Sequence, residues 1–341
     1  MSGAHKGEWF VNPVRVAVTL SEPRMQMLDS PEFRQILQTH CDVRWNPWGR
    51  DLHPSEIADF IGDADMVLTS WGSPPLSTED LDRLRQLKVV AHAAGTVKHL
   101  VPQDIFSRGI VVLSGASRIA QSVAEYCLAG ILGWLNHLES FSQQLHRGGW
   151  RTGELRRHEL FGTRVGVVSA SLTGRRLIRL LAPFGCEVRV YDPYLSQEEA
   201  ESLGVERASL EEVLASAIVS VHAPALAATH HLLDRHHLAH IPDGAIFVNS
   251  SRGSVVDEAA LHDELVSGRF VAVLDVFDHE PLASDHPLRR LPNVVLTPHV
   301  AGDTWEGRRA LLPLLAKEAL KCIDGQASDL AVSRARFATL A

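Results

Sequence analysis

The sequence predicts an α/β protein with two doubly wound parallel sheets. Short apolar runs rich in β-branched residues alternate with helical patterns along most of the chain, and the runs fall into two sets. Such runs, apolar on both faces, are typical of strands that helices cover on both sides. A length of 341 residues also favours two domains over one core. We therefore expect two α/β domains, each with its own sheet.

The strands are expected at eleven places. The first set of runs covers residues 14–20, 43–45, 65–69, 89–92 and 110–113. The second set covers residues 165–169, 188–191, 218–222, 245–249, 272–276 and 294–297.

A long helical pattern, residues 119–146, separates the two sets. Apolar residues recur there at spacings of three and four, Ser117 is a candidate N-cap, and Gly148-Gly149 ends the pattern. The polar stretch 147–160 contains an isolated Trp150, and it is predicted as either an arm that reaches another subunit or a surface loop.

A last helical pattern, residues 306–323, comes after the final strand of the second set, so it can return to the first domain. The sequence therefore predicts a discontinuous domain, residues 1–116 plus 303–341, into which residues 117–302 are inserted. The tail beyond Gly325 gives no clear prediction.

Composition excludes several classes of protein. Hydrophobic residues make up 45% and charged residues 22% of the chain, as in ordinary globular proteins. The net charge of −8 argues against a nucleic-acid partner. Residues 1–12 contain no apolar core of a signal peptide, and no apolar run reaches the roughly 18 residues that span a bilayer. We therefore expect no membrane partner and a cytoplasmic location. The four cysteines form no C-x-x-C pair, so we expect reduced thiols, as in a reducing compartment.

The second set opens with the pattern of a dinucleotide site. The strand at 165–169 leads into a turn and a helix at 175–182, and the next strand ends at Asp192. A G-x-G-x-x-G fingerprint with an acid about 20 residues on belongs at this place. Here the glycine positions hold Ser169, Ser171 and Gly174, so only the glycine that lets helix and strand pack closely is present.

The two serines are expected to weaken nucleotide binding without abolishing it. Ser169 stands where a tight turn favours glycine, and the Cβ of Ser171 stands where the backbone approaches the pyrophosphate. About 1–3 kcal/mol per strained contact would cost one to two decades in affinity. Backbone N–H groups near Leu172 and Thr173 still offer an anion site. Asp192 at a strand end favours NAD over NADP, although it is also a candidate turn-initiating Asp before Pro193.

Three further segments come after strands of the second set, and each carries one chemically capable residue. Arg252 lies beyond the strand at 245–249, Glu280 beyond the strand at 272–276, and His299 beyond the strand at 294–297. Ligands bind at this edge of open α/β sheets. Taken singly, each residue is more often a surface Arg, a loop-end Glu or a core His, but three at neighbouring strand ends favour a site.

At these segments the sequence resembles the D-isomer-specific 2-hydroxyacid dehydrogenase family, which includes phosphoglycerate, glycerate and D-lactate dehydrogenases. The likeness extends to residues 87–90 leading to Ala94-Gly95-Thr96, to Val123-Ala124-Glu125, and to His222-Ala223-Pro224 followed by Thr229. The resemblance implies a flavodoxin-like substrate domain, an inserted Rossmann domain that binds NAD, and a homodimer that pairs through the 119–146 helix and the Trp150 arm.

The resemblance also implies roles for the three residues. Arg252 would hold the substrate carboxylate and keto oxygen with its planar fork of donors. His299 would protonate the keto oxygen as hydride reaches C2, and act as the base in reverse. Glu280 would fix the imidazole tautomer and favour its charged form. The reaction implied is hydride transfer between a nicotinamide and C2 of a 2-keto acid or D-2-hydroxy acid.

Binding residues are implied by the same resemblance. Asp275 would accept from the nicotinamide carboxamide, and the backbone N–H groups of Ala94 and Gly95, with Arg252, would hold the substrate carboxylate. The expected cofactor-binding set is Ser171, Leu172, Thr173, Gly174, Asp192, His222, Pro224, Thr229, Ser250 and Asp275.

Three alternatives remain beside this interpretation. A non-catalytic homologue that binds nucleotide weakly and acts through a partner is motivated by the altered glycine loop. A relative of formate dehydrogenases is disfavoured, because those enzymes pair the catalytic His with Gln where this chain has Glu280. The histidines at 230, 231, 236, 237 and 240 could include a metal-binding pair, His236 and His240, but a solvated helix is preferred and no metal is expected.

Overall fold

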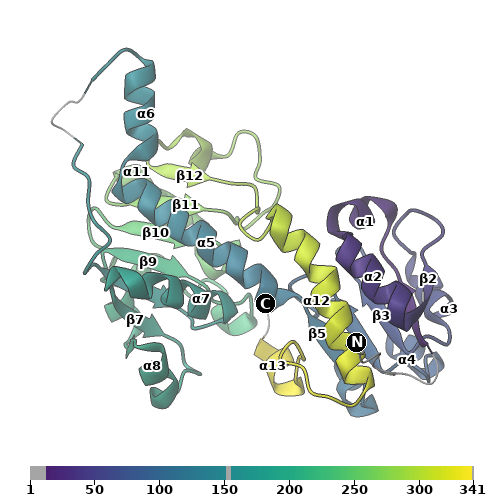
Figure 1. Ribbon diagram of the computed structural model, residues 1–341. Helices are drawn as coiled ribbons and strands as arrows, with labels where there is room; N and C mark the ends of the chain where they lie inside the picture. Colours follow the sequence, from purple (N-terminus) through teal and green to yellow (C-terminus); the bar gives the residue numbers. More distant parts are fainter. Residues whose placement is uncertain (1–12, 151–154, 340–341) are drawn as a thin grey trace, which may run out of the picture. The chain divides into compact units, whose positions relative to one another are not determined.

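The computed structural model describes residues 13–150 and 155–339 (Figure 1). Contacts divide the chain into two compact units, residues 1–119 with 304–341 and residues 120–303. The polar N-terminal segment 1–12, including His5, and part of the predicted arm, residues 151–154, lie outside the described residues.

The first unit contains a five-stranded parallel sheet in the order β2-β1-β3-β4-β5. This is the flavodoxin-like order, as expected. Its strands are β1 (Val14–Val18), β2 (Cys41–Trp45), β3 (Met66–Thr69), β4 (Val89–His92) and β5 (Val111–Ser114). Its helices are α1 (Glu22–Leu28), α2 (Pro31–His40), α3 (Ile57–Ile61), α4 (Thr78–Arg83), α12 (Trp305–Ile323) and α13 (Arg334–Thr339), with 3₁₀ segments at Pro54–Glu56 and Gln103–Arg108.

The alternation of side chains explains why this sheet is buried on both faces. Val16 and Val18 of β1 belong to a core with α1, α2 and α12, whereas Ala17 belongs to a core with α3 and α4. Successive side chains of a strand point to opposite faces, so an all-apolar strand needs helices on both sides. Helix α12 supplies Leu312 and Leu315, both fully buried, to the first of these cores.

The second unit contains a seven-stranded parallel sheet in the order β12-β11-β10-β9-β6-β7-β8. Strands β6 to β8 run towards one edge and β9 to β12 towards the other, so the order reverses between β6 and β9 in the doubly wound Rossmann arrangement. The strands are β6 (Arg164–Val168), β7 (Glu187–Tyr191), β8 (Glu206–Arg207), β9 (Ile218–Val221), β10 (Ile246–Asn249), β11 (Val271–Leu274) and β12 (Val294–Leu296). The helices are α5 (Ala116–Leu135), α6 (Leu138–His146), α7 (Leu172–Leu181), α8 (Gln197–Leu203), α9 (Leu210–Leu214), α10 (Arg235–Leu238) and α11 (Glu258–Ser267), with 3₁₀ segments at Ala182–Phe184, Ala227–Thr229, Gly253–Val255 and Pro287–Arg290.

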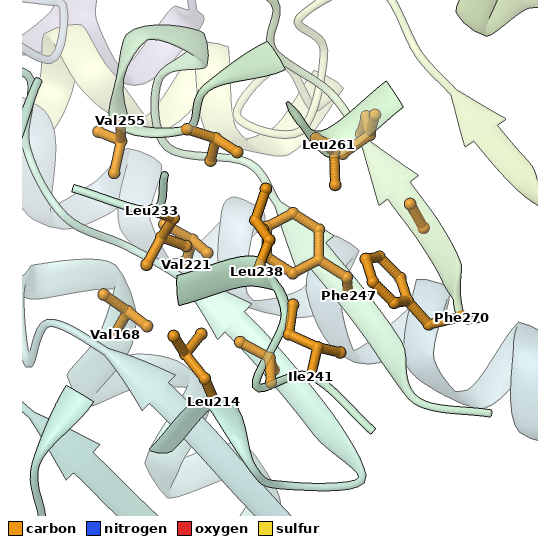
Figure 2. Packing of buried hydrophobic residues seen from close by; sticks show 14 of the residues in the cluster. Val168, Leu214, Val221, Leu233, Leu238, Ile241, Phe247, Val255, Leu261 and Phe270 are labelled. Atoms are coloured by element: carbon orange, nitrogen blue, oxygen red, sulfur yellow. The ribbon is translucent and has the colours of Figure 1, made fainter. Parts of the chain in front are cut away.

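Two cores cover the faces of this sheet. Ile246 and Val248 of β10 pack with α5 and α7 on one face, while Phe247 between them packs with α9, α10 and α11 on the other. Figure 2 shows this second core, in which the rings of Phe247 and Phe270 lie beside Leu238 and Ile241, their centroids 6.2 Å apart. These cores hold the carboxyl ends of β9, β10 and β11 rigidly, and the candidate site is built there.

The predicted fold class is confirmed, with local corrections. The helix expected at 119–146 is two helices, because His137 adopts a left-handed conformation (φ +49°) between α5 and α6. Ser117 lies inside α5 and is not its N-cap. The edge strand β8 and the tail helix α13 were not predicted. None of the helices in the described ranges has the length and apolar composition needed to cross a membrane.

Candidate active site

The turn after β6 adopts the conformation that its glycine-like pattern requires. Ser169 has φ +79°, a region that residues with a Cβ rarely occupy, and its N–H donates to the Tyr191 carbonyl at 2.7 Å. A Cβ on Gly174 would lie 2.2 Å from the Ser169 carbonyl oxygen, so only glycine lets α7 start this close to the strand. The turn is therefore as tight as a dinucleotide fingerprint needs, with a serine in the strained position.

Ser171 is the N-cap of α7. Its hydroxyl oxygen accepts from the Gly174 N–H at 3.3 Å, which satisfies one of the unpaired donors at the helix start. The hydroxyl proton is not used by this bond and can be donated to an anion. Leu172 and Thr173 form the first turn of α7, whose N–H groups favour negative charge.

The Asp192 carboxylate accepts hydrogen bonds from the turn after β6 and from the turn after β7, to which Asp192 itself belongs. Its Oδ2 accepts from the Ala170 N–H at 2.8 Å and from the Ser169 hydroxyl at 3.1 Å, while Oδ1 accepts from the Tyr194 N–H at 2.8 Å. The bond to Tyr194 is the Asx turn of the alternative interpretation. Both interpretations are therefore compatible, because the same carboxylate initiates a turn and stands beside the nucleotide loop.

His222, Pro224 and Thr229 come after β9 and form one structured turn. The Thr229 hydroxyl donates to the Pro224 carbonyl at 2.5 Å and accepts from the Leu226 N–H at 2.9 Å. His222 is 4% exposed, and its Nε2 lies 2.9 Å from the Ser220 hydroxyl. Burial lowers the pKa of His222 to about 4, so this ring is neutral at physiological pH.

The side chain of Ser250 is directed into the protein. It is 9% exposed, and its hydroxyl lies 3.0 Å from the buried Cys127 thiol of α5. Burial raises the pKa of Cys127 to about 11, so the thiol stays protonated and unreactive. The expected part of Ser250 in cofactor binding stays a prediction.

Asp275 is the organiser of the loop that carries His299. The carboxylate is 1% exposed. Its Oδ1 accepts from the Val300 N–H at 2.8 Å and from the Thr297 hydroxyl at 2.5 Å, and its Oδ2 accepts from the Ala301 N–H at 2.8 Å. These donors compensate the burial of a charged group and fix the loop after β12.

A tyrosine from α5 completes this chain of hydrogen bonds. The Tyr126 hydroxyl lies 2.6 Å from the Thr297 hydroxyl. Since Thr297 gives its only proton to the Asp275 carboxylate, it must accept from Tyr126. Burial raises the pKa of Tyr126 to about 12, so the phenol remains a donor at working pH.

His299 and Glu280 form a hydrogen-bonded pair. The His299 Nδ1 lies 2.7 Å from the Glu280 Oε2, and the other carboxylate oxygen accepts from the Phe277 N–H at 3.0 Å. Both side chains are partly exposed, at 47% for His299 and 35% for Glu280. His299 also has φ +56°, and its N–H donates to the Asp275 carbonyl at 2.9 Å. A strained residue held by several bonds is typical of a functional position.

Arg252 lies after β10, the strand next to β11 in the sheet. Asn249 shapes its loop: the amide oxygen accepts from the Ser251 N–H at 3.1 Å, and the amide nitrogen donates to the Arg252 carbonyl at 3.2 Å. Burial lowers the pKa of Arg252, while the charge of Glu280 acts in the opposite direction. A guanidinium that is half-buried and lies within electrostatic reach of Glu280 is suited to bind an anion.

The predicted substrate-binding residues Ala94 and Gly95 belong to the first unit. They come after β4, and Ala94 is 2% exposed. The Ser114 hydroxyl donates to the Gly95 carbonyl at 2.6 Å, which fixes the loop. The backbone around Gly95 is open, since a Cβ there would meet no atom within 4 Å.

The histidine-rich segment does not form a metal centre in the described part of the chain. The rings of His236 and His240 lie 5.2 Å apart at an angle of 89°, but no group of three or more His, Cys, Asp or Glu side chains is placed to hold a metal ion among the described residues. His240 also lies beyond the end of α10, so the pair does not share the helix that was expected. His237 instead bonds to Asp234, the N-cap of α10, at 2.7 Å.

Sequence reasoning missed the residues that support the site. Asn249, Tyr126 and Thr297 bear the hydrogen bonds that shape the Arg252 and His299 loops. A signal existed for Thr297 and Asn249, because each is a polar residue at the end of an apolar strand. For Tyr126, a polar group on a buried helix stripe was the only signal.

Comparison with known proteins gives the family. Residues 128–301 match the model of the D-isomer specific 2-hydroxyacid dehydrogenase, NAD binding domain. A Bacillus subtilis protein named as a 2-hydroxyacid dehydrogenase is 38% identical over 287 residues, which cover 81% of this chain and 82% of that protein.

Two further relatives agree. D-3-phosphoglycerate dehydrogenase of Mycobacterium tuberculosis is 35% identical over 281 residues, 82% of this chain and 52% of that protein. This chain thus spans about half the length of such phosphoglycerate dehydrogenase relatives. The crystal structure of a phosphoglycerate oxidoreductase from Rhizobium etli superposes with a TM-score of 0.81 at 28% identity, covering 94% of this chain and 98% of that one.

The match, the relatives and the two flavodoxin-like and Rossmann-like sheets agree with the resemblance seen in the sequence, and they confirm NAD as the coenzyme class of the second unit. The chain belongs to the D-isomer specific 2-hydroxyacid dehydrogenase family.

Proposed function

We propose that this chain catalyses reversible hydride transfer between NAD and C2 of a small 2-keto acid or D-2-hydroxy acid. The observation that carries the proposal is the His299–Glu280 hydrogen bond of 2.7 Å at the carboxyl edge of the second sheet, with the half-buried Arg252 after the neighbouring strand. An acid–base pair beside an anion-binding cation is the arrangement that reduction of a 2-keto acid requires.

His299 is proposed as the general acid and base. Because an ionised Glu280 can only accept, the Nδ1 of His299 carries a proton, and Nε2 is the atom that exchanges a proton with the substrate oxygen. Glu280 is itself held by the Phe277 N–H, so it presents a fixed acceptor to the ring. The exposure of His299 leaves its outer edge accessible to a substrate.

Arg252 is proposed to bind the substrate carboxylate and keto oxygen. Its guanidinium has a planar fork of donors, and its partial burial strengthens any bond to an anion. The polarised keto carbon would then accept hydride while His299 protonates its oxygen. The backbone N–H groups of Ala94 and Gly95 are proposed as further donors to the carboxylate.

The residues present fit a dinucleotide. The positive φ of Ser169, the contact that forbids a Cβ at Gly174, and the start of the ten-residue helix α7 form the turn that cradles a pyrophosphate. When bound, the nicotinamide supplies or takes up the hydride. We propose that Asp192 holds the adenosine ribose and disfavours NADP. The side chain of Asp275 is proposed chiefly to hold the His299 loop, because three donors already occupy it.

Turnover of NADH with a panel of 2-keto acids tests the proposal. We expect oxidation of NADH, followed by its absorbance, with at least one small keto acid, and no reduction of NAD by formate. Calorimetry with NADH accompanies the assay. Binding without turnover of any panel member would favour a non-catalytic homologue, and no heat at millimolar NADH would exclude an NAD-dependent enzyme.

We also propose a homodimer that pairs through α5 and α6. The support is apolar exposure on and after α6, where Leu138, Leu145 and Trp150 are 64%, 52% and 76% exposed. Apolar side chains this exposed favour contact with a second copy. A monomeric mass in light scattering at micromolar concentration would contradict this proposal.

A cytoplasmic location is proposed from the thiols. All four cysteines are unpaired in the structure, as expected in a reducing compartment. Cell fractionation tests the location, and recovery outside the cytoplasm would contradict it.

A further inference from the structure

We propose that Ser169 is a positioning residue for coenzyme choice: its hydroxyl holds the Asp192 carboxylate against the nucleotide loop, where that carboxylate accepts from ribose and repels a 2′-phosphate. The inference rests on the proposed binding of NAD. It assigns a function to one of the two serines that stand at glycine positions in this loop.

The backbone of Ser169 is strained. Its φ of +79° is open to glycine and costly for a residue with a Cβ. The Ser169 carbonyl oxygen lies close to the start of α7, 2.2 Å from the place that a Cβ on Gly174 would take, so the turn and the helix are packed tightly here. A side chain in this conformation therefore needs a compensating interaction.

The Ser169 hydroxyl provides the interaction that compensates. It donates to Asp192 Oδ2 at 3.1 Å, and the Ser169 N–H donates to the Tyr191 carbonyl at 2.7 Å. One residue of the turn thus binds the end of β7 through both backbone and side chain. A hydrogen bond to a carboxylate is stronger than one between neutral groups, so it can offset the strained backbone.

The hydroxyl bond also restricts Asp192. The carboxylate receives two backbone donors, Ala170 N–H on Oδ2 and Tyr194 N–H on Oδ1, and the Ser169 hydroxyl adds a side-chain donor to Oδ2. Both oxygens are thereby fixed in direction, and Oδ1 keeps a lone pair for a ribose hydroxyl. A glycine at position 169 could not supply the third bond.

The consequence is selectivity. A carboxylate that cannot swing away keeps its charge where a 2′-phosphate would lie, whereas a looser one can turn aside and reduce the repulsion. Ser169 therefore sharpens the discrimination between NADH and NADPH that Asp192 provides. Serine at this position lacks the conformational freedom of glycine, but its hydroxyl fixes the direction of the Asp192 carboxylate.

Calorimetry on the 341-residue chain with NADH and with NADPH tests this. In S169A the strained Cβ remains and the hydroxyl is lost, so the ratio of the NADPH Kd to the NADH Kd should fall about threefold to tenfold. S169G also loses the hydroxyl, so it should show a similar fall in the ratio. The two variants should differ in thermal stability: Tm should fall by about 2–4 °C in S169A and stay near that of the wild type in S169G, where the strain is relieved.

A double-mutant cycle with Asp192 shows whether Ser169 acts through the carboxylate. D192A should remove most of the discrimination, and adding S169A to D192A should change the ratio no further. A ratio that is unchanged or raised in both S169A and S169G overturns the inference, as does an equal fall in the D192A background. If the wild type binds neither dinucleotide, the proposed function fails and the inference with it; if it binds NADH and only the serine variants behave otherwise than expected, the inference alone fails.

Discussion

The two sheets are built in the same way, but different residues stand at the ends of their strands. In the second unit the strands β10, β11 and β12 lead to Arg252, Glu280 and His299, all partly accessible. In the first unit β3 and β4 end in Thr69 and His92, both fully buried and bonded to each other at 2.9 Å. The loops beyond β10, β11 and β12 thus bear accessible charged groups, whereas the last residues of β3 and β4 form a buried pair, and this difference supports the proposal that the chemistry lies at the edge of the second sheet.

The largest expected effect is a difference in kcat between variants of two histidines, the accessible His299 and the buried His92. His299→Asn should lower kcat about 10²- to 10⁴-fold with little change in Tm, because it removes a general acid from an accessible position. His92→Asn is the matched control: it should lower Tm by several degrees while the folded fraction keeps its activity, since His92 is buried beneath the first edge. Steady-state kinetics and thermal melts of both variants measure this contrast. Equal loss of kcat in the two variants would contradict the assignment of chemistry to the second edge.

The sequence was sufficient for the sheets because most of the central strands are short runs dominated by apolar, β-branched residues. It also placed Arg252, Glu280 and His299 at neighbouring strand ends, since parallel strands deliver the loops after them to one edge. The features that it could not give depend on three-dimensional contacts. The break at His137 rests on one left-handed residue in an otherwise periodic helix.

The sequence also did not predict the direction in which side chains point. Asp275 and Ser250 come directly after strands, and the structure adds that the Asp275 carboxylate holds the His299 loop and that the Ser250 hydroxyl faces Cys127. Neither composition nor spacing reveals these hydrogen bonds. The bond from Ser169 to Asp192 likewise joins two strands that are paired only in the folded sheet.

Alanine should change the free energy of unfolding differently at two glycines, Gly174 in the second unit and Gly95 in the first. Gly174→Ala should reduce the free energy of unfolding by about 2–3 kcal/mol, because its Cβ would lie 2.2 Å from the Ser169 carbonyl oxygen. Gly95→Ala should change it by less than about 0.5 kcal/mol, because no atom lies within 4 Å of the added Cβ. Urea unfolding of both variants at neutral pH measures the difference. Equal stability of the two variants would show that the turn after β6 is not as tight as described.

Acid should destabilise both units through one buried histidine each. Burial lowers the pKa of His92 to about 3 and that of His222 to about 4, below the value of about 6.5 in an unfolded chain. The unfolded state therefore binds more protons below about pH 6.5, and stability falls as the pH drops from there towards these values. Each ring should account for a loss of roughly 2–3 kcal/mol by about pH 4.5.

Urea unfolding between neutral pH and about pH 4.5 measures this loss. His222→Gln should flatten the pH dependence of the second unit, and His92→Gln that of the first, as followed by hydrogen exchange in each. An unchanged slope in both variants would show that other groups control the acid response.

The smallest expected effect concerns the support of the His299 loop. Tyr126→Phe removes a buried donor and leaves the Thr297–Asp275 bond intact, so it should cost about 1 kcal/mol in stability and roughly two- to fivefold in kcat. Thr297→Val should cost more, because it takes the partner from the Tyr126 hydroxyl and removes one of the three donors to the buried Asp275 carboxylate. Kinetics and urea unfolding of both variants rank them. If Tyr126→Phe cost as much as Thr297→Val, the tyrosine would act on the loop by a route other than the threonine, and the hydrogen-bonded chain from α5 to the catalytic edge would not be the support of His299.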